Sequence, residues 1–146
     1  NYYIRLLEKS RGRCFKNIGV VYIDLNGLKQ INDEQGHEAG DSFIRRAAQQ
    51  IVAVFPEHTY RIGGDEFVVI YPDILQQQFE FLINQLRLNA RQHHVSISCG
   101  SVWRTECMAL DEMLKEADEK MYEDKKKFYE KREHDRRRDI RRSEYM

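Results

Sequence analysis

The chain has no net charge, little proline and no long apolar run. Its 24 Lys and Arg residues are balanced by 24 Asp and Glu residues, so bulk electrostatics favour neither a nucleic acid nor a membrane surface as a partner. No apolar stretch approaches the ~20 residues of a membrane-spanning helix, and no signal-peptide pattern opens the sequence. Any binding of a polyanion would therefore have to be local.

Cysteine is also scarce. Cys14, Cys99 and Cys107 are odd in number and lack the close spacing of a metal site, and Cys99 lies in an apolar strand. We interpret all three as reduced thiols, which favours a cytoplasmic location. The chain starts at Asn1 without an initiator Met, so we expect a piece of a longer protein. Whether that longer protein has a membrane anchor is left open by the sequence.

The composition is that of one globular domain with a charged end. With 146 residues and 41% hydrophobic content, the chain can bury a single core. Beyond about Lys126, basic and acidic residues alternate and apolar residues become rare. We therefore predict a globular domain over residues 1–128 and a charged helical extension or tail over residues 129–146. A nucleic-acid-binding arm is the less favoured alternative, because the acids dilute the positive charge.

Hydrophobic periodicity predicts an α/β fold. The expected elements are an opening helix near residues 3–7, a buried strand at 17–23, a short helical turn at 27–31, a loop at 36–40, a helix from 41 to 56, a hairpin at 58–71, a helix at 75–86, a strand at 95–103 and a helix at 110–122. Mixed connections between these elements favour an antiparallel-rich central sheet flanked by helices.

The tip of the predicted hairpin carries two adjacent acids. Only Gly63, Gly64, Asp65 and Glu66 separate its two β-rich runs, and a glycine pair supplies the positive φ angles of a tight turn. Two acids on a rigid turn repel each other unless a proton or a cation lies between them. For this turn alone, a solvated loop would be the simpler interpretation.

Asp24 ends the buried strand, and pairing of the hairpin beside that strand would bring Asp24 and Asp65 to one edge of the sheet. Such a pair of carboxylates suits Mg²⁺, which prefers a few carboxylates together with phosphate oxygens. The alternative is that Asp24 caps the helix that follows, as Asp41 would cap its own helix.

The segment between these two acids has features of a nucleotide site. Gly27 opens a helix, whose N-terminal N–H groups attract phosphate, and Lys29 adds a positive charge nearby. Asn32 can donate and accept hydrogen bonds while an ionised Asp41 only accepts, which complements the edge of a guanine. Helix capping by both residues remains the alternative.

Four segments together resemble the GGDEF domain of diguanylate cyclases. They are residues 24–41 (DLNGLKQINDEQGHEAGD), 61–67 (RIGGDEF), 95–100 (VSISCG) and 117–125 (ADEKMYEDK), and the likeness runs from about residue 1 to residue 125. The resemblance implies a fold like that of nucleotidyl cyclases and polymerase palms. It also implies condensation of two GTP molecules into cyclic di-GMP and two pyrophosphates.

The resemblance assigns a role to each site residue. Two Mg²⁺ (or Mn²⁺) ions per site would be held by Asp24, Asp65, Glu66 and the backbone carbonyl of Leu25, with Asp65 as the proton acceptor, Glu66 assisting and Lys29 stabilising the developing charge. The substrate would be bound by Gly27, Leu28, Asn32, His37, Asp41, Gly64 and Lys125. Catalysis would need a homodimer, with an attached N-terminal sensory domain in the full-length protein and no contact of this domain with nucleic acid or membrane.

The chain departs from the family pattern at several positions. Asn26 stands where many members have Asp, Leu28 where many have Phe, and Tyr129 where many have Arg. The family's opening segment is missing, and residues 54–57 lack the R-x-x-D pattern of the product-inhibition site. The competing interpretations are a catalytically silent GTP-binding module that regulates an attached domain, and a plain structural domain.

Overall fold

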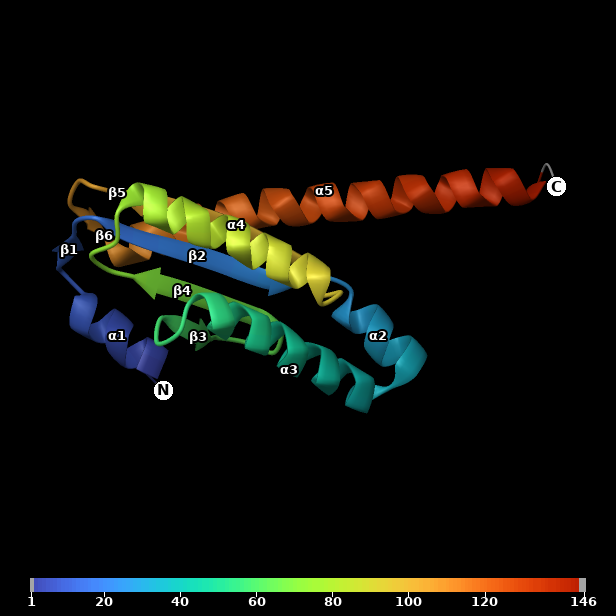
Figure 1. Ribbon diagram of the computed structural model, residues 1–146, viewed down its shortest axis with the longest axis horizontal. Coiled ribbons are helices and arrows are strands. Elements are labelled where there is room, and N and C mark those ends of the chain that lie inside the picture. Colours follow the sequence, from blue (N-terminus) through green and yellow to red (C-terminus); the bar gives the residue numbers. More distant parts are fainter. Residues whose placement is uncertain (1, 145–146) are drawn as a thin grey trace.

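The computed structural model describes residues 2–144, which form a sheet with helices on both faces (Figure 1). The element order is α1 (Tyr2–Ser10), β1 (Cys14–Phe15), β2 (Ile18–Leu25), α2 (Leu28–Gln35), α3 (His37–Val54), β3 (Thr59–Arg61), β4 (Glu66–Tyr71), α4 (Gln76–Gln92), β5 (Ile97–Arg104), β6 (Met108–Ala109) and α5 (Leu110–Glu144).

The main sheet has the strand order β3-β4-β2-β5, and every neighbouring pair is antiparallel. The central strand β2 is therefore paired on both edges, which explains why its sequence is apolar almost throughout. This arrangement confirms the predicted antiparallel-rich α/β fold. The short pair β1–β6 forms a separate sheet that the sequence pattern did not reveal.

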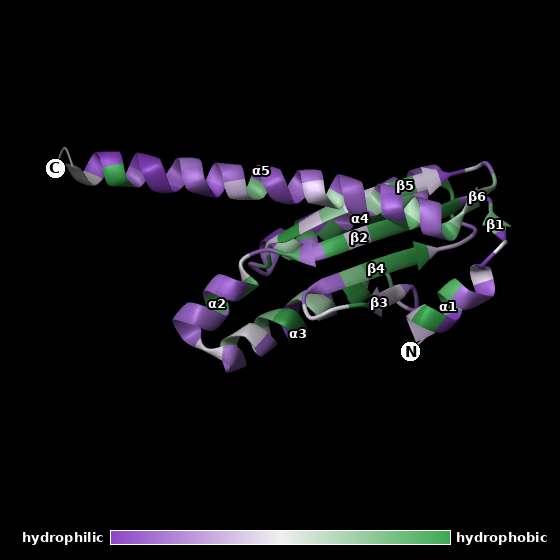
Figure 2. Cartoon of the chain, turned by 180° about the vertical axis from the view of Figure 1, so that it is seen from behind, coloured by the Kyte–Doolittle hydropathy of each residue, from purple (hydrophilic) through white to green (hydrophobic). Residues whose placement is uncertain are grey.

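Alternating residues of β2 enter two cores. Val21, Ile23 and Leu25 pack with the apolar faces of α3 and α4, whereas Ile18 and Val20 pack with α1 and α5. Figure 2 shows that β2 and β4 are largely hydrophobic (green), whereas the helices around them carry many hydrophilic residues (purple). The two faces of one strand thus help to hold α3 and α4 on one side and α1 and α5 on the other.

The prediction for the segment after β2 was partly wrong. Residues 36–40 are not a loop, because α3 begins at His37, and α2 is longer than the predicted turn. Gly36 alone separates the two helices, with a φ of 91° that L side chains rarely adopt. The sharp change of direction therefore needs one residue instead of five.

The prediction of three reduced thiols was wrong for two of them. Cys14 and Cys107 form a disulfide, because the pairing of β1 with β6 brings together residues that are 93 positions apart in the chain. Cys99 is free and buried, as expected for a cysteine in an apolar strand. The cysteine pattern therefore gives no support for a cytoplasmic location.

Helix α5 runs 35 residues and projects beyond the sheet in Figure 1. Its first third packs on the sheet through Leu110, Met113, Leu114 and Ala117. Within residues 2–144, no helix combines the length and apolar character needed to cross a membrane. The charged extension is thus helical up to Glu144, and the domain boundary at residue 128 stays a prediction.

Candidate active site

The hairpin tip and the end of the central strand meet at one edge of the sheet. Asp24 on β2 is paired in register with Glu66 on β4, and the Leu25 N–H donates to the Asp65 carbonyl at 2.9 Å. The predicted meeting of Asp24 and Asp65 is therefore present in the structure. It follows directly from the pairing of the hairpin beside β2.

Asp24 is the most constrained acid at this edge. Its residue is only 8% exposed, and one carboxylate oxygen, Oδ1, is buried without a hydrogen-bond partner. The other, Oδ2, lies 2.8 Å from the Lys125 ammonium. Burial raises the pKa of Asp24, the Lys125 contact opposes that rise, and the charge of Asp65 reinforces it.

The pKa of Glu66 is raised by similar causes. Burial raises the pKa of Glu66, and the charges of Asp24 and Asp65 add to the effect, while a hydrogen bond from Tyr22 lowers it. The Tyr22 hydroxyl donates to Glu66 Oε2 at 3.4 Å. Burial and the neighbouring acids favour the protonated forms of Asp24 and Glu66, and a bound cation would favour their charged forms.

The residues present fit a Mg²⁺ ion that is shared with a substrate. No three acidic, histidine or cysteine side chains of residues 2–144 are grouped closely enough to hold a metal alone. Mg²⁺ in phosphoryl-transfer sites is usually bound by one or two carboxylates together with substrate phosphates and water. The unpartnered Oδ1 of Asp24 is an acceptor suited to this arrangement.

Lys125 reaches this edge from α5. Besides its pairing with Asp24, its ammonium donates to the Leu25 carbonyl at 3.3 Å, so one cation touches two of the predicted metal ligands. The ammonium also lies 5.9 Å from the centre of the Tyr129 ring, one helical turn further on. The sequence predicted Lys125 as a phosphate contact and did not predict this ion pair.

The turn after β2 exposes the start of α2. Gly27 has a left-handed φ of 81° and caps the helix without any side-chain hydrogen bond. Asp24 therefore does not cap α2, which removes the alternative explanation for this acid. The first N–H groups of the helix, including those of Leu28 and Lys29, have no intrahelical acceptor and are free to bind an anion.

Asn32 and Asp41 lie at the corner where α2 and α3 meet. A Cβ atom built on Gly40 would collide with the Asn32 side-chain oxygen, so Asn32 lies directly against α3 beside Asp41. Asp41 is in the second turn of α3 and is exposed, so it does not cap the helix. His37 is exposed at the start of α3, with no described bond to Asn32 or Asp41.

The Gly-Gly turn does not use the backbone that we predicted. Neither Gly63 nor Gly64 has a positive φ, and a Cβ atom on Gly64 would meet nothing within 4 Å. The Arg61 guanidinium instead stabilises the turn, donating to the Gly63 carbonyl at 3.1 Å and to the Gly64 carbonyl at 2.9 Å. The turn itself therefore does not require glycine at position 64.

Sequence reasoning missed a set of hydrogen bonds between the turn that follows β2 and the start of β5. Asn26 is 3% exposed, donates through its side chain to Ser96 at 3.1 Å and accepts from the Ser98 hydroxyl at 2.9 Å. Its side chain fixes the turn to the start of β5, and alternate polar residues in the V-S-I-S segment were the available signal.

The acids at this edge predict how Mg²⁺ stabilisation depends on pH. In the folded domain the pKa values of Asp24 and Glu66 are raised above their ordinary values of 3.8 and 4.5. Without metal, the domain therefore loses stability as the pH rises from these ordinary values through the raised pKa values. Mg²⁺ needs the deprotonated carboxylates, so its stabilising effect should grow over the same window. We expect a Mg²⁺-dependent rise in Tm near pH 8 that disappears towards about pH 4.

Thermal melting in the presence of a GTP analogue that cannot react, with and without millimolar Mg²⁺, measures this effect. The matched control is Asp24→Asn, which keeps the size of the side chain and removes its charge; it should melt at the same temperature with and without Mg²⁺. An equal Mg²⁺ shift at both ends of the pH range, or a shift that persists in Asp24→Asn, would contradict the metal assignment.

Comparisons with known proteins agree on one family. The family model described as the diguanylate cyclase GGDEF domain matches residues 4–131. Diguanylate cyclase DgcS of Shewanella oneidensis is 27% identical over 135 residues, covering 86% of this chain and 46% of that protein. Probable diguanylate cyclase DgcJ of Escherichia coli is 36% identical over 111 residues, covering 72% of this chain and 22% of that protein. The chain thus spans less than half the length of these relatives.

The fold comparison gives the same result. The crystal structure of the FimX GGDEF domain from Pseudomonas aeruginosa superimposes with a TM-score of 0.73 at 17% identity, covering 86% of this chain and 87% of that one. At this level of identity the likeness establishes the fold alone.

Proposed function

The chain belongs to the diguanylate cyclase GGDEF domain family, and on that premise we propose that it is an active cyclase that condenses two GTP molecules into cyclic di-GMP and two pyrophosphates. The observation that carries the proposal is the edge where Asp24 and Asp65 meet, with the unpartnered Asp24 Oδ1 close to the open N-terminus of α2.

Each element around this edge supplies one part of the proposed reaction. The N–H groups at Leu28 and Lys29 bind the β- and γ-phosphates, and the Lys29 ammonium stabilises the charge that develops there. Asp65 accepts the proton of the attacking 3′-hydroxyl, while Tyr22 keeps Glu66 oriented towards the same edge. When bound, two Mg²⁺ ions would lower the pKa of that hydroxyl and neutralise charge on the α-phosphate.

Lys125 has two successive partners in this proposal. In the structure its ammonium neutralises Asp24 and contacts the Leu25 carbonyl. Asp24 and the Leu25 carbonyl would both be ligands of a bound metal, which would release the flexible Lys125 side chain to bind the substrate phosphates. The space beside Gly64, where a Cβ would meet nothing, leaves room for the substrate at the same edge.

Catalysis needs two copies of the domain. One active-site edge holds one GTP, and forming two new bonds between two GTP molecules requires two such edges face to face, as in an isologous C₂ dimer. In the full-length protein, an attached N-terminal sensory domain would control this encounter. The dimer is thus part of the proposed active site.

Two observations favour a second candidate, a silent module that binds GTP and regulates an attached domain. Lys125 already neutralises Asp24, and Tyr129 replaces the Arg that many members place one turn beyond this lysine. The ion pair competes with metal binding at Asp24, and the missing Arg leaves one positive side chain fewer for the substrate phosphates.

The deciding experiment uses the domain fused after a parallel coiled coil, which raises the effective concentration of one copy for the other. The fused dimer is incubated with GTP and Mg²⁺, and the products are separated by chromatography. Cyclic di-GMP supports the cyclase. Retained GTP binding without product supports the silent module, and neither binding nor product would contradict both.

The corner between α2 and α3 predicts selectivity for guanine. Asn32 and Asp41 complement the guanine edge, whereas adenine lacks the N2 amine and would leave Asp41 without its donor, at a cost of about 1–3 kcal/mol. Gly40→Ala should displace the Asn32 side chain and weaken GTP binding by a similar amount. Calorimetric titration with GTP and ATP analogues that cannot react measures both effects.

The matched control for Gly40→Ala is Ser42→Ala, which alters an exposed position on the same helix. It should bind GTP like the unmodified domain. Equal affinities for GTP and ATP analogues would contradict the assignment of Asn32 and Asp41, whereas unchanged GTP binding in Gly40→Ala would contradict the role of the Asn32 position alone.

A further inference from the structure

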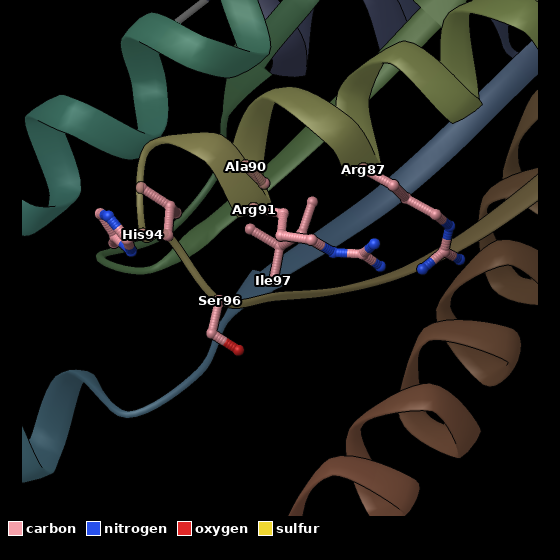
Figure 3. A pocket seen from close by; sticks show the side chains of 7 residues that line it. Arg87, Ala90, Arg91, His94, Ser96 and Ile97 are labelled. Carbon is pink, nitrogen blue, oxygen red and sulfur yellow. The ribbon is translucent and has the colours of Figure 1, made fainter.

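A second concavity lies where α4 ends and β5 begins. It has a volume of about 470 Å³, and its polar lining comes from Arg87, Arg91, His94 and Ser96 (Figure 3). Arg87 and Arg91 are four residues apart on α4, so their side chains leave the same face of the helix. None of the residues proposed to bind GTP or metal lines this cavity.

Positive charge predominates in the lining. It contains two guanidinium groups and an imidazole but no acidic side chain. Within residues 2–144, the Arg91 side chain has no ion pair or hydrogen bond, and Arg87 approaches only Asp124, at 3.7 Å. By contrast, Arg104 contacts both carboxylate oxygens of Glu116, at 2.8 and 2.6 Å.

Helix capping explains only part of this cluster. Arg91 is in the last turn of α4, where a cation is favourable next to the helix C-terminus. Arg87 lies one turn earlier, and Ser96 lies beyond the helix, so neither benefits from this effect. The Ser96 oxygen accepts from the Asn26 side chain at 3.1 Å, which leaves the Ser96 O–H available as a donor to a ligand.

We propose that this cavity is a separate binding site for a diphosphate group, either free pyrophosphate or the diphosphate of a nucleotide. Guanidinium groups bind phosphate oxygens through paired N–H donors, and two of them together with a hydroxyl match an anion that carries several oxygens. The volume is in the range of small-molecule sites. The site does not depend on the cyclase activity proposed above.

Calorimetric titration of the whole domain with sodium pyrophosphate, and separately with ADP, tests this proposal in the absence of divalent cations. We expect one pyrophosphate per domain and at least about tenfold weaker binding after combined Arg87→Gln and Arg91→Gln substitution. Tighter binding of ADP than of pyrophosphate would identify a nucleotide as the ligand, and equal or weaker binding would identify the free anion.

Two variants separate this site from other basic surfaces. Arg45→Gln removes an exposed arginine from α3 and should leave pyrophosphate binding unchanged, as should Lys29→Gln at the phosphate turn. Thermal melting verifies that each variant is folded. Absence of binding to the unmodified domain, unchanged binding in the double variant, or loss of binding in Lys29→Gln would each overturn the proposal.

The outcome is distinguishable from a failure of the proposed cyclase activity. Asp65→Asn removes an acid that does not line the cavity, so pyrophosphate should bind this variant as it binds the unmodified domain. If the domain makes no cyclic di-GMP but binds pyrophosphate through Arg87 and Arg91, the result supports this binding site and contradicts the proposed cyclase activity.

Discussion

Asp65→Asn is expected to abolish cyclic di-GMP synthesis while the domain remains folded. An amide ligates Mg²⁺ poorly and cannot accept a proton from the 3′-hydroxyl, so we expect turnover to fall at least about 100-fold. The side chain contributes little to packing, because Asp65 lies on the turn between β3 and β4, outside both cores. Its backbone carbonyl, which accepts from the Leu25 N–H, is retained in the variant.

GTP consumption and thermal melting of the coiled-coil dimer should be measured on the same preparation. Asp139→Asn makes the same chemical change far along α5 and serves as the control, with activity equal to that of the unmodified dimer. Substantial turnover by folded Asp65→Asn would contradict the role of Asp65, and would leave Asp24 and Glu66 as the acids that carry the reaction.

The position of Asp65 was predictable because it depends on strand pairing alone. The apolar run of β2 identifies a central strand, the alternating runs around residues 63–66 identify a hairpin, and antiparallel pairing of the two places Asp24 opposite Glu66. The glycine pair marked the turn correctly, although its backbone lacks the positive φ angles that we expected.

The contacts of Lys125 and Asn26 were not predictable in the same way. Lys125 is 100 residues from Leu25 in the chain, and its ion pair with Asp24 depends on how α5 crosses the sheet. Asn26 meets Ser98 72 residues away, through the pairing of β2 with β5. No local pattern encodes such distances between elements, so the sequence predicted candidate site residues but not the contacts between them.

The disulfide illustrates the same limit. Residues 14 and 107 carry no spacing signal, and the two strands that join them are only two residues long each. Periodicity needs more residues than that to distinguish a strand from a loop. A short strand pair is therefore visible only after the long elements have placed its two halves next to each other.

The crossing of α5 over the sheet depends on Gly100, which is paired with Tyr22 at the centre of β5. A Cβ atom at this position would collide with the Ala117 carbonyl oxygen and the Met121 nitrogen, both in the backbone of α5. Backbone atoms cannot rotate out of the way as a side chain can. The glycine of the V-S-I-S-x-G segment therefore permits the helix to lie directly on the strand.

Gly100→Ala is accordingly expected to destabilise the domain strongly, because the whole helix has to move away from the sheet. Overpacking of this kind costs about 1–3 kcal/mol, which corresponds to a Tm lower by roughly 3–10 °C for a domain of this size. Since Lys125 lies one turn beyond Met121, the same movement should separate its ammonium from Asp24 and the Leu25 carbonyl. The substitution would thus change the active site although position 100 is not one of its residues.

Gly64→Ala is the matched control, because the added Cβ would meet nothing within 4 Å and the backbone φ is not positive. Its Tm should equal that of the unmodified domain. If Gly100→Ala also melts like the unmodified domain, α5 does not rest on β5 as closely as described, and the placement of Lys125 at the active-site edge fails with it. If only Gly100→Ala is destabilised, the same close contact explains both the glycine in the strand and the position of the lysine.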